Sequence, residues 1–216
     1  MGFRVSVGRV PTGKDGLEQR AATTDTPAMR LFHFSDDPEI AVFEPRPVLI
    51  PAERAPGKGW LNGPLVWAIE DDWQALYLFP RDCPRILLSP KPTTSLEDMA
   101  RWFPPGSAQM IAYVEQAWFE RILVSKLYRY ELPCQTFEPL EDAGMWVSNQ
   151  AVVPIARNQL ANLLEALATK GVELRVVESL LPLSDIWASS LHASGIRLRN
   201  AQGWLATGQP LRATGR

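Results

Sequence analysis

Residues 30–46 read RLFHFSDDPEIAVFEPR and residues 65–85 read LVWAIEDDWQALYLFPRDCPR, and these two stretches decide the fold. Each opens on a short, largely apolar run, at residues 31–34 and 65–69, and such runs are typical of buried strands. Residues 45–64, which lead from the first stretch to the second, hold five prolines and three glycines. That composition predicts a long loop between two strands of the core.

The remainder of the chain predicts further strands separated by short helices. Strands are expected at residues 85–88, 109–114, 127–132, 145–148, 172–177 and 195–200. Helices are expected to begin at Asp71, at a capping box formed by Thr94 and Glu97, and at Asn158, the last of them ending at Lys170. Because strands outnumber the helices that could cross between them, we expect an α+β fold. Its sheet should be mixed and mostly antiparallel, with helices at the periphery.

The composition favours one compact domain and excludes several classes of protein. Of the 216 residues 46% are hydrophobic, and the formal net charge is −2, without the strongly basic surface of a dedicated nucleic-acid binder. Cys83 and Cys134 stand in no paired motif, which suits a reducing cytoplasm. No apolar run approaches the roughly 20 residues that cross a bilayer, so we expect a cytoplasmic protein without a membrane partner.

The two ends of the sequence differ from its middle. Residues 1–28 lack sustained periodicity, and Met29 directly precedes the first predicted strand. We therefore expect residues 1–28 to be a disordered extension, or to come from an upstream start codon. Residues 29–202 should form the domain and residues 203–216 a flexible tail. The oligomeric state is left open.

The first candidate site is a pocket for an anionic ligand that contains a ring. His33 and Ser35 lie on the first predicted strand and Trp67 on the second. Tyr77, Arg81 and Arg85 follow, and two arginines suit the binding of an anion. The alternative interpretation is structural: a core histidine, packed aromatic rings and arginines on either side of a turn.

A second hypothesis is a hydrolase in which His33 activates the thiol of Cys83. It requires the two side chains to lie within hydrogen-bonding distance. The sequence contains no GxGxxG or GxxxxGK[ST] phosphate loop, no HExxH or CxxC metal motif and no GxSxG elbow. No metal site is therefore predicted, and most of the common enzyme classes that a local motif identifies are excluded.

Several short motifs resemble an uncharacterised bacterial family whose members open MRLFHFS. The resemblance rests on residues 30–35, 66–68, 79–85, 127–132, 146–148 and 194–200. It spans roughly residues 29–201 and implies no known activity.

Some of these motifs are also similar, more distantly, to the ADP-ribosyltransferase-like fold. The similar features are a strand with His33 and Ser35, the motif Val66-Trp67-Ala68, and the late strand motif Trp146-Val147-Ser148. The resemblance implies a sheet split around a cleft that binds NAD or a related nucleotide. His33 and Ser35 would hold the ribose and amide, Trp67 would stack on the nicotinamide, and Trp146 and Ser148 would line the same cleft.

The resemblance also implies a late catalytic glutamate that stabilises the cationic sugar as nicotinamide leaves. Met145 occupies the expected position, and the nearby carboxylates are Glu138 and Glu141. ADP-ribosyl transfer or NAD cleavage is therefore left open. Without a carboxylate, the cleft would serve a non-catalytic module that binds a ligand or a protein. The nucleotide cleft that this resemblance implies requires the rings of His33 and Trp67 to face one cleft.

Overall fold

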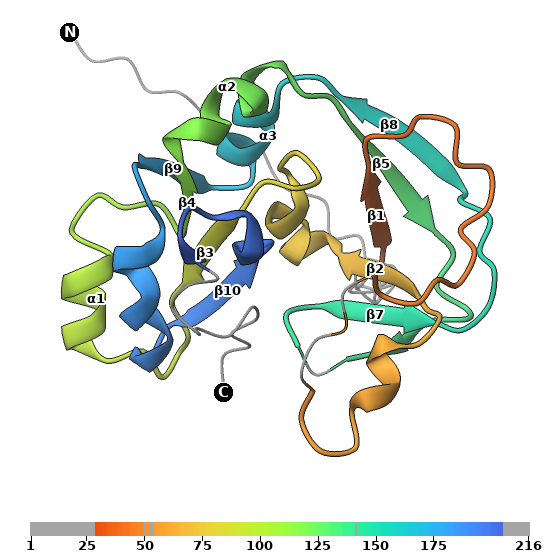
Figure 1. Cartoon of the computed structure of the whole chain (residues 1–216), viewed down its shortest axis with the longest axis horizontal. Helices are drawn as coiled ribbons and strands as arrows, with labels where there is room; N and C mark the ends of the chain where they lie inside the picture. Colours follow the sequence, from red (N-terminus) through yellow and green to blue (C-terminus); the bar gives the residue numbers. More distant parts are fainter. Residues whose placement is uncertain (1–28, 50, 52–53, 141, 205–216) are drawn as a thin grey trace, which may run out of the picture.

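Ten strands form two sheets in the described part of the chain, which comprises residues 29–49, 51, 54–140 and 142–204 of a computed structural model. Figure 1 shows the sheets beside each other, with the 3-10 helix η2 (Asp71–Tyr77) between them. The predicted α+β class is confirmed, and so is the mostly antiparallel arrangement of the strands.

The larger sheet has six strands in the order β6-β7-β2-β1-β5-β8, and neighbouring strands are antiparallel throughout. Its strands are β1 (Leu31–Ser35), β2 (Val66–Glu70), β5 (Leu127–Leu132), β6 (Glu138–Pro139), β7 (Met145–Ser148) and β8 (Ala156–Leu160). Residues 30–46 and 65–85 thus supply two adjacent central strands, β1 and β2.

The smaller sheet has four strands in the order β10-β3-β4-β9. They are β3 (Arg85–Ser89), β4 (Met110–Glu115), β9 (Val172–Val177) and β10 (His192–Ile196). The β4–β9 pair is parallel, which makes this sheet mixed. The helices are α1 (Leu96–Trp102), α2 (Gln116–Val124) and α3 (Leu163–Thr169), with 3-10 helices η1 (Gly59–Asn62), η3 (Leu181–Ala188) and η4 (Leu198–Asn200) besides η2.

Strand β1 is buried on both faces, which explains its apolar composition. Phe32 points into a core that also contains Leu87 of β3 and Leu163 of α3, so this core joins the two sheets. Leu31 points to the opposite face and packs against Phe43, which belongs to the loop after β1. A third core lies on the far side of the smaller sheet, beneath α1 and η3.

Three predicted boundaries are wrong, each for a local reason. The helix predicted from Asn158 begins at Leu163, because residues 156–160 pair with β5 and Asn162 caps the helix through the N–H of Glu165. The capping box lies one residue later than predicted, at Ser95 and Asp98. The last strand ends at Ile196, because Arg197 takes a left-handed conformation with φ of 57°.

The packed domain extends beyond its predicted end at residue 202. Trp204 is fully buried, and its ring lies 5.7 Å from that of Trp187, edge to face. The predicted extension at residues 1–28 and residues 205–216 of the predicted tail lie outside the described residues.

Candidate functional site

The side chains of His33 and Trp67 lie on opposite faces of the larger sheet. His33 pairs with Tyr130 of β5, and Trp67 pairs with Val147 of β7. Since residues opposite each other share a face and neighbours along a strand alternate, His33 shares the face of Leu31, and Trp67 shares the face of Phe32. The expectation that both rings face one cleft is therefore wrong.

His33 is fixed by its backbone and aromatic neighbours. Its Nδ1 lies 2.8 Å from the carbonyl oxygen of Trp67, and its ring centroid lies 4.7 Å from that of Phe43. A carbonyl only accepts, so Nδ1 carries the proton. Burial lowers the pKa of His33, and the charges of Arg81 and Arg46 lower it further, against the effect of the hydrogen bond. The ring is therefore neutral at pH 7.

Other polar residues predicted on these strands hold nearby loops. The buried Ser35 accepts a hydrogen bond through Oγ from the N–H of Asp37, at 3.1 Å. Ser148 is also buried, and its Oγ lies 3.1 Å from Oγ1 of Thr136. Trp146 donates its indole N–H to the carboxylate of Glu70 at 2.6 Å. These contacts support a structural role for Ser35, Ser148 and Trp146.

The weak carboxylate candidates do not complete a catalytic site around His33. Glu138 is exposed on β6 and pairs with Val147, which places it on the face opposite His33. Glu141 lies outside the described residues.

Cys83 does not form the predicted dyad with His33. Its side chain is buried in the core between the sheets, together with Phe32, whereas His33 faces the other way. Its Sγ lies 3.6 Å from the carbonyl oxygen of Pro84, and burial raises the pKa of the thiol to about 11. A buried protonated thiol is a poor nucleophile, so the geometry does not support a Cys83 hydrolase.

We expect Cys83 to resist alkylation in the folded protein. Iodoacetamide at pH 8 should label Cys134, which is half-buried, much faster than Cys83, because the thiolate of Cys83 is rare and inaccessible. Peptide mass spectrometry after timed quenching measures both rates, and urea-unfolded protein supplies the control in which both react. Rapid native labelling of Cys83 would contradict this assignment.

The structure does bring together the predicted arginines, with two more that the sequence argument did not select. Arg85 is 3% exposed and lies beneath the surface at the start of β3. Its Nε and Nη2 donate to the carbonyl oxygen of Leu76 at 2.9 and 2.7 Å, and its Nη1 donates to that of Cys83 at 2.9 Å. Among the described residues, Arg85 forms no ion pair with a carboxylate.

Arg197 lies next to Arg85 and reaches the turn that carries Arg81. Its Nε donates to the carbonyl oxygen of Arg81 at 3.2 Å, and its positive charge lowers the pKa of Arg85, after burial, to about 10. Burial lowers the pKa of Arg197 as well, and the nearby Arg199 lowers it further. We call Arg81, Arg85, Arg197 and Arg199 the arginine cluster.

Two aromatic rings and two carboxylates lie beside the arginine cluster. Tyr77 lies 5.9 Å from the guanidinium of Arg85 and stacks on Phe34 of β1 at 6.4 Å, with an interplanar angle of 11°. Asp36 forms an ion pair with Arg81 at 3.1 Å, and both side chains are more than half exposed. Asp82 partly offsets the charge of Arg197. Four arginines thus meet two aspartates where the end of β1 approaches the smaller sheet.

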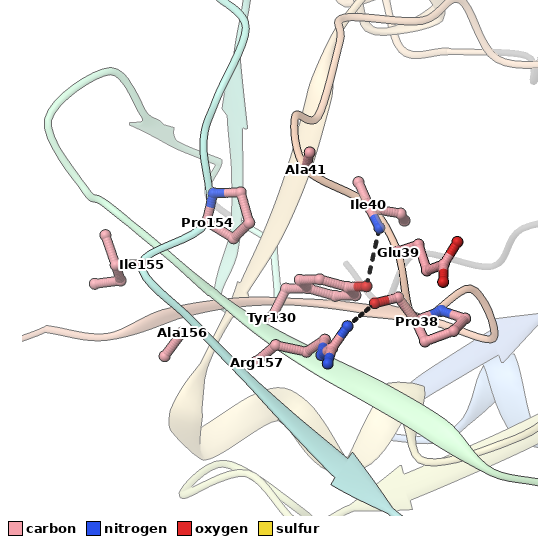
Figure 2. Close-up of a pocket in the computed structure, with 9 residues that line it drawn as sticks. All are labelled: Pro38, Glu39, Ile40, Ala41, Tyr130, Pro154, Ile155, Ala156 and Arg157. Atoms are coloured by element: carbon pink, nitrogen blue, oxygen red, sulfur yellow. Dashed lines mark hydrogen bonds between the residues drawn. The ribbon is translucent and has the colours of Figure 1, made fainter.

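A separate pocket of about 310 Å³ lies between the loop after β1 and the start of β8. Figure 2 shows Tyr130 at its base, with Pro38 and Ile40 on one side and Arg157 on the other. The hydroxyl of Tyr130 donates to the carbonyl of Asp37 and accepts from the N–H of Ile40, while Arg157 donates to the carbonyl of Pro38. The principal polar groups of this pocket therefore already form hydrogen bonds within the protein.

Among the residues that the structure describes, no group of three or more histidine, cysteine or acidic side chains could hold a metal ion. Within the same residues, every helix is too short or too polar to cross a membrane.

Comparison with known proteins identifies the family. No curated protein and no solved structure matches the chain. Residues 32–201 match the family of unknown function DUF6886. That span contains both sheets and the whole arginine cluster, and the chain therefore belongs to the DUF6886 family.

Proposed function

We propose that this protein binds a small phosphate-bearing ligand at the arginine cluster. The observation that carries the proposal is the convergence of Arg81, Arg85, Arg197 and Arg199 beside Asp36 and Asp82. Like charges at close range, one of them buried, repel each other strongly. A bound anion would relieve that repulsion, and guanidinium groups match the geometry of phosphate.

The four arginines would contribute differently to the site. Arg81 is exposed, and Arg197 and Arg199 are half-buried, so these three would contact the ligand. Arg85 is committed to the carbonyl groups of Leu76 and Cys83, and it would attract the anion from below without touching it.

A nucleotide fits the neighbourhood better than inorganic phosphate does. Tyr77 and Phe34 form a stacked aromatic pair beside the cluster, and a base could pack against their exposed edges. His33 lies close enough to Arg81 for the charge of Arg81 to lower its pKa. NAD and ADP-ribose are the first ligands to test, because each carries both phosphate groups and a base. The proposal covers binding and no bond cleavage.

Isothermal titration calorimetry with NAD, ADP-ribose, pyrophosphate and nicotinamide tests the proposal. The phosphate-bearing compounds should bind and nicotinamide alone should not, and affinity should fall as salt is added. Arg197→Gly should weaken binding about 10- to 100-fold, because it removes one charged contact. Glycine tolerates the left-handed conformation of residue 197, so this variant keeps the backbone unstrained.

Arg101→Ala is the matched control, because Arg101 is exposed on α1 and pairs with Asp185. It should bind each ligand as the wild type does. The proposal fails if no phosphate-bearing compound binds at low salt, or if Arg197→Gly binds them as tightly as the wild type.

A further inference from the structure

Strand β8 is an open edge of the larger sheet. It pairs with β5 on one side, and its main chain makes no hydrogen bond with any other described segment. Residues 156–159 are exposed, and Leu160 is half-buried. Figure 1 shows β8 at the outer side of the sheet, away from the smaller sheet.

This edge lacks most of the features that protect natural edges from pairing. Residues 156–160 contain no proline and no lysine, and the strand has five residues. The opposite edge, β6, has only two residues and offers a poor template. The single charge on β8 is Arg157, whose guanidinium bonds to the carbonyl of Pro38 and lies 5.8 Å from the ring of Tyr128. These two contacts hold the side chain of Arg157 against the sheet to which it belongs.

We propose that β8 pairs with β8 of a second copy of this chain, antiparallel and centred on Asn158. In this register Ala156 lies opposite the second copy's residue 160, and Arg157 lies opposite its residue 159, a glutamine. The two larger sheets then continue into each other across a twofold axis.

Self-pairing suits the residues of this strand. No like charges meet, because each arginine faces a glutamine, and the two Asn158 amides can bond to each other across the axis. Ile155, 65% exposed, precedes the strand, and Figure 2 shows its side chain directed away from Tyr130. In the same register Ile155 meets residue 161, an alanine, so pairing covers an exposed apolar side chain.

The expected dimer is weak, because five residue pairs bury far less than a standard interface. Sedimentation velocity on the full chain should show a monomer at about 1 µM and a growing dimer fraction toward several hundred µM.

Two substitutions with opposite predicted effects test the register. Asn158→Lys places two lysines across the axis and should weaken the dimer about tenfold. Gln159→Glu places a carboxylate opposite Arg157 in two symmetric pairs and should strengthen the dimer several-fold. Both positions are exposed, so circular dichroism should show unchanged folding.

Asn149→Lys adds the same charge at an exposed position outside β8 and is the matched control. It should dimerise as the wild type does. The proposal is overturned if the wild type stays monomeric throughout the range. It is also overturned if Asn158→Lys behaves like Asn149→Lys, or if Gln159→Glu fails to strengthen the dimer.

Discussion

Replacement of Arg85 by methionine should lower the free energy of unfolding by about 3 kcal/mol. The guanidinium of Arg85 is the donor that satisfies the carbonyl oxygens of Leu76 and Cys83, through three hydrogen bonds. Methionine fills similar space but donates nothing, so two buried acceptors lose their partners. Each such acceptor costs about 1–3 kcal/mol, and relief from burying the charge offsets part of that loss.

Urea denaturation followed by tryptophan fluorescence measures the effect. Arg85→Lys should recover only part of the stability, because a lysine cannot donate to both carbonyls in the geometry of the planar guanidinium. Arg101→Met is the control at an exposed ion pair, and it should cost less than about 1 kcal/mol. If Arg85→Met and Arg101→Met lose the same stability, the carbonyl groups do not depend on Arg85.

Gly144→Ala should lower the free energy of unfolding by about 2–4 kcal/mol. Gly144 has φ of +63°, and a Cβ at this position would lie 2.3 Å from Cδ1 of Trp73 and 3.2 Å from Oε2 of Glu70. The substitution therefore adds a collision to the backbone strain. Trp73 would have to move, and its ring also lies 5.0 Å from that of His192 on β10.

Gly171→Ala separates these two contributions. Gly171 has φ of +68°, but no atom lies within 4 Å of its added Cβ, so it reports the backbone strain alone, about 1 kcal/mol. Thermal and urea unfolding of both variants give the difference. If both substitutions lower the free energy of unfolding by the same amount, a Cβ at residue 144 does not collide with Trp73.

The sequence was most informative where a strand has one strong pattern. The predicted bounds of β5, β7 and β9 agree with the structure, because alternation or a continuous apolar run marks each strand. The end of β10 could not be predicted in this way. Arg197 carries no sequence signal for a left-handed conformation, which a non-glycine residue seldom adopts.

The sequence also could not predict which residues of the candidate site lie together in space. His33 and Trp67 each lie on a predicted strand, but only the register of β1 and β2 decides which face each ring takes. A shift of one residue reverses the face, and apolar runs without alternation do not specify it. Arg81 and Arg85 were selected from their own stretch. Their proximity to Arg197 could not be predicted, because Arg197 lies more than a hundred residues later in the chain and reaches the Arg81 turn only in the folded protein.

The position of β1 also determines when the protein can fold during synthesis. This strand lies between β2 and β5, and Leu31 pairs with Glu70 on one side and with Leu132 on the other. A growing chain that has released β2 still exposes the second edge of β1. That edge stays without its partner until β5, which ends at Leu132, has also left the ribosome, about 60 residues after the end of β2 at Glu70. Contacts this distant along the chain make folding slow, and the nascent protein must tolerate an unpaired central strand meanwhile.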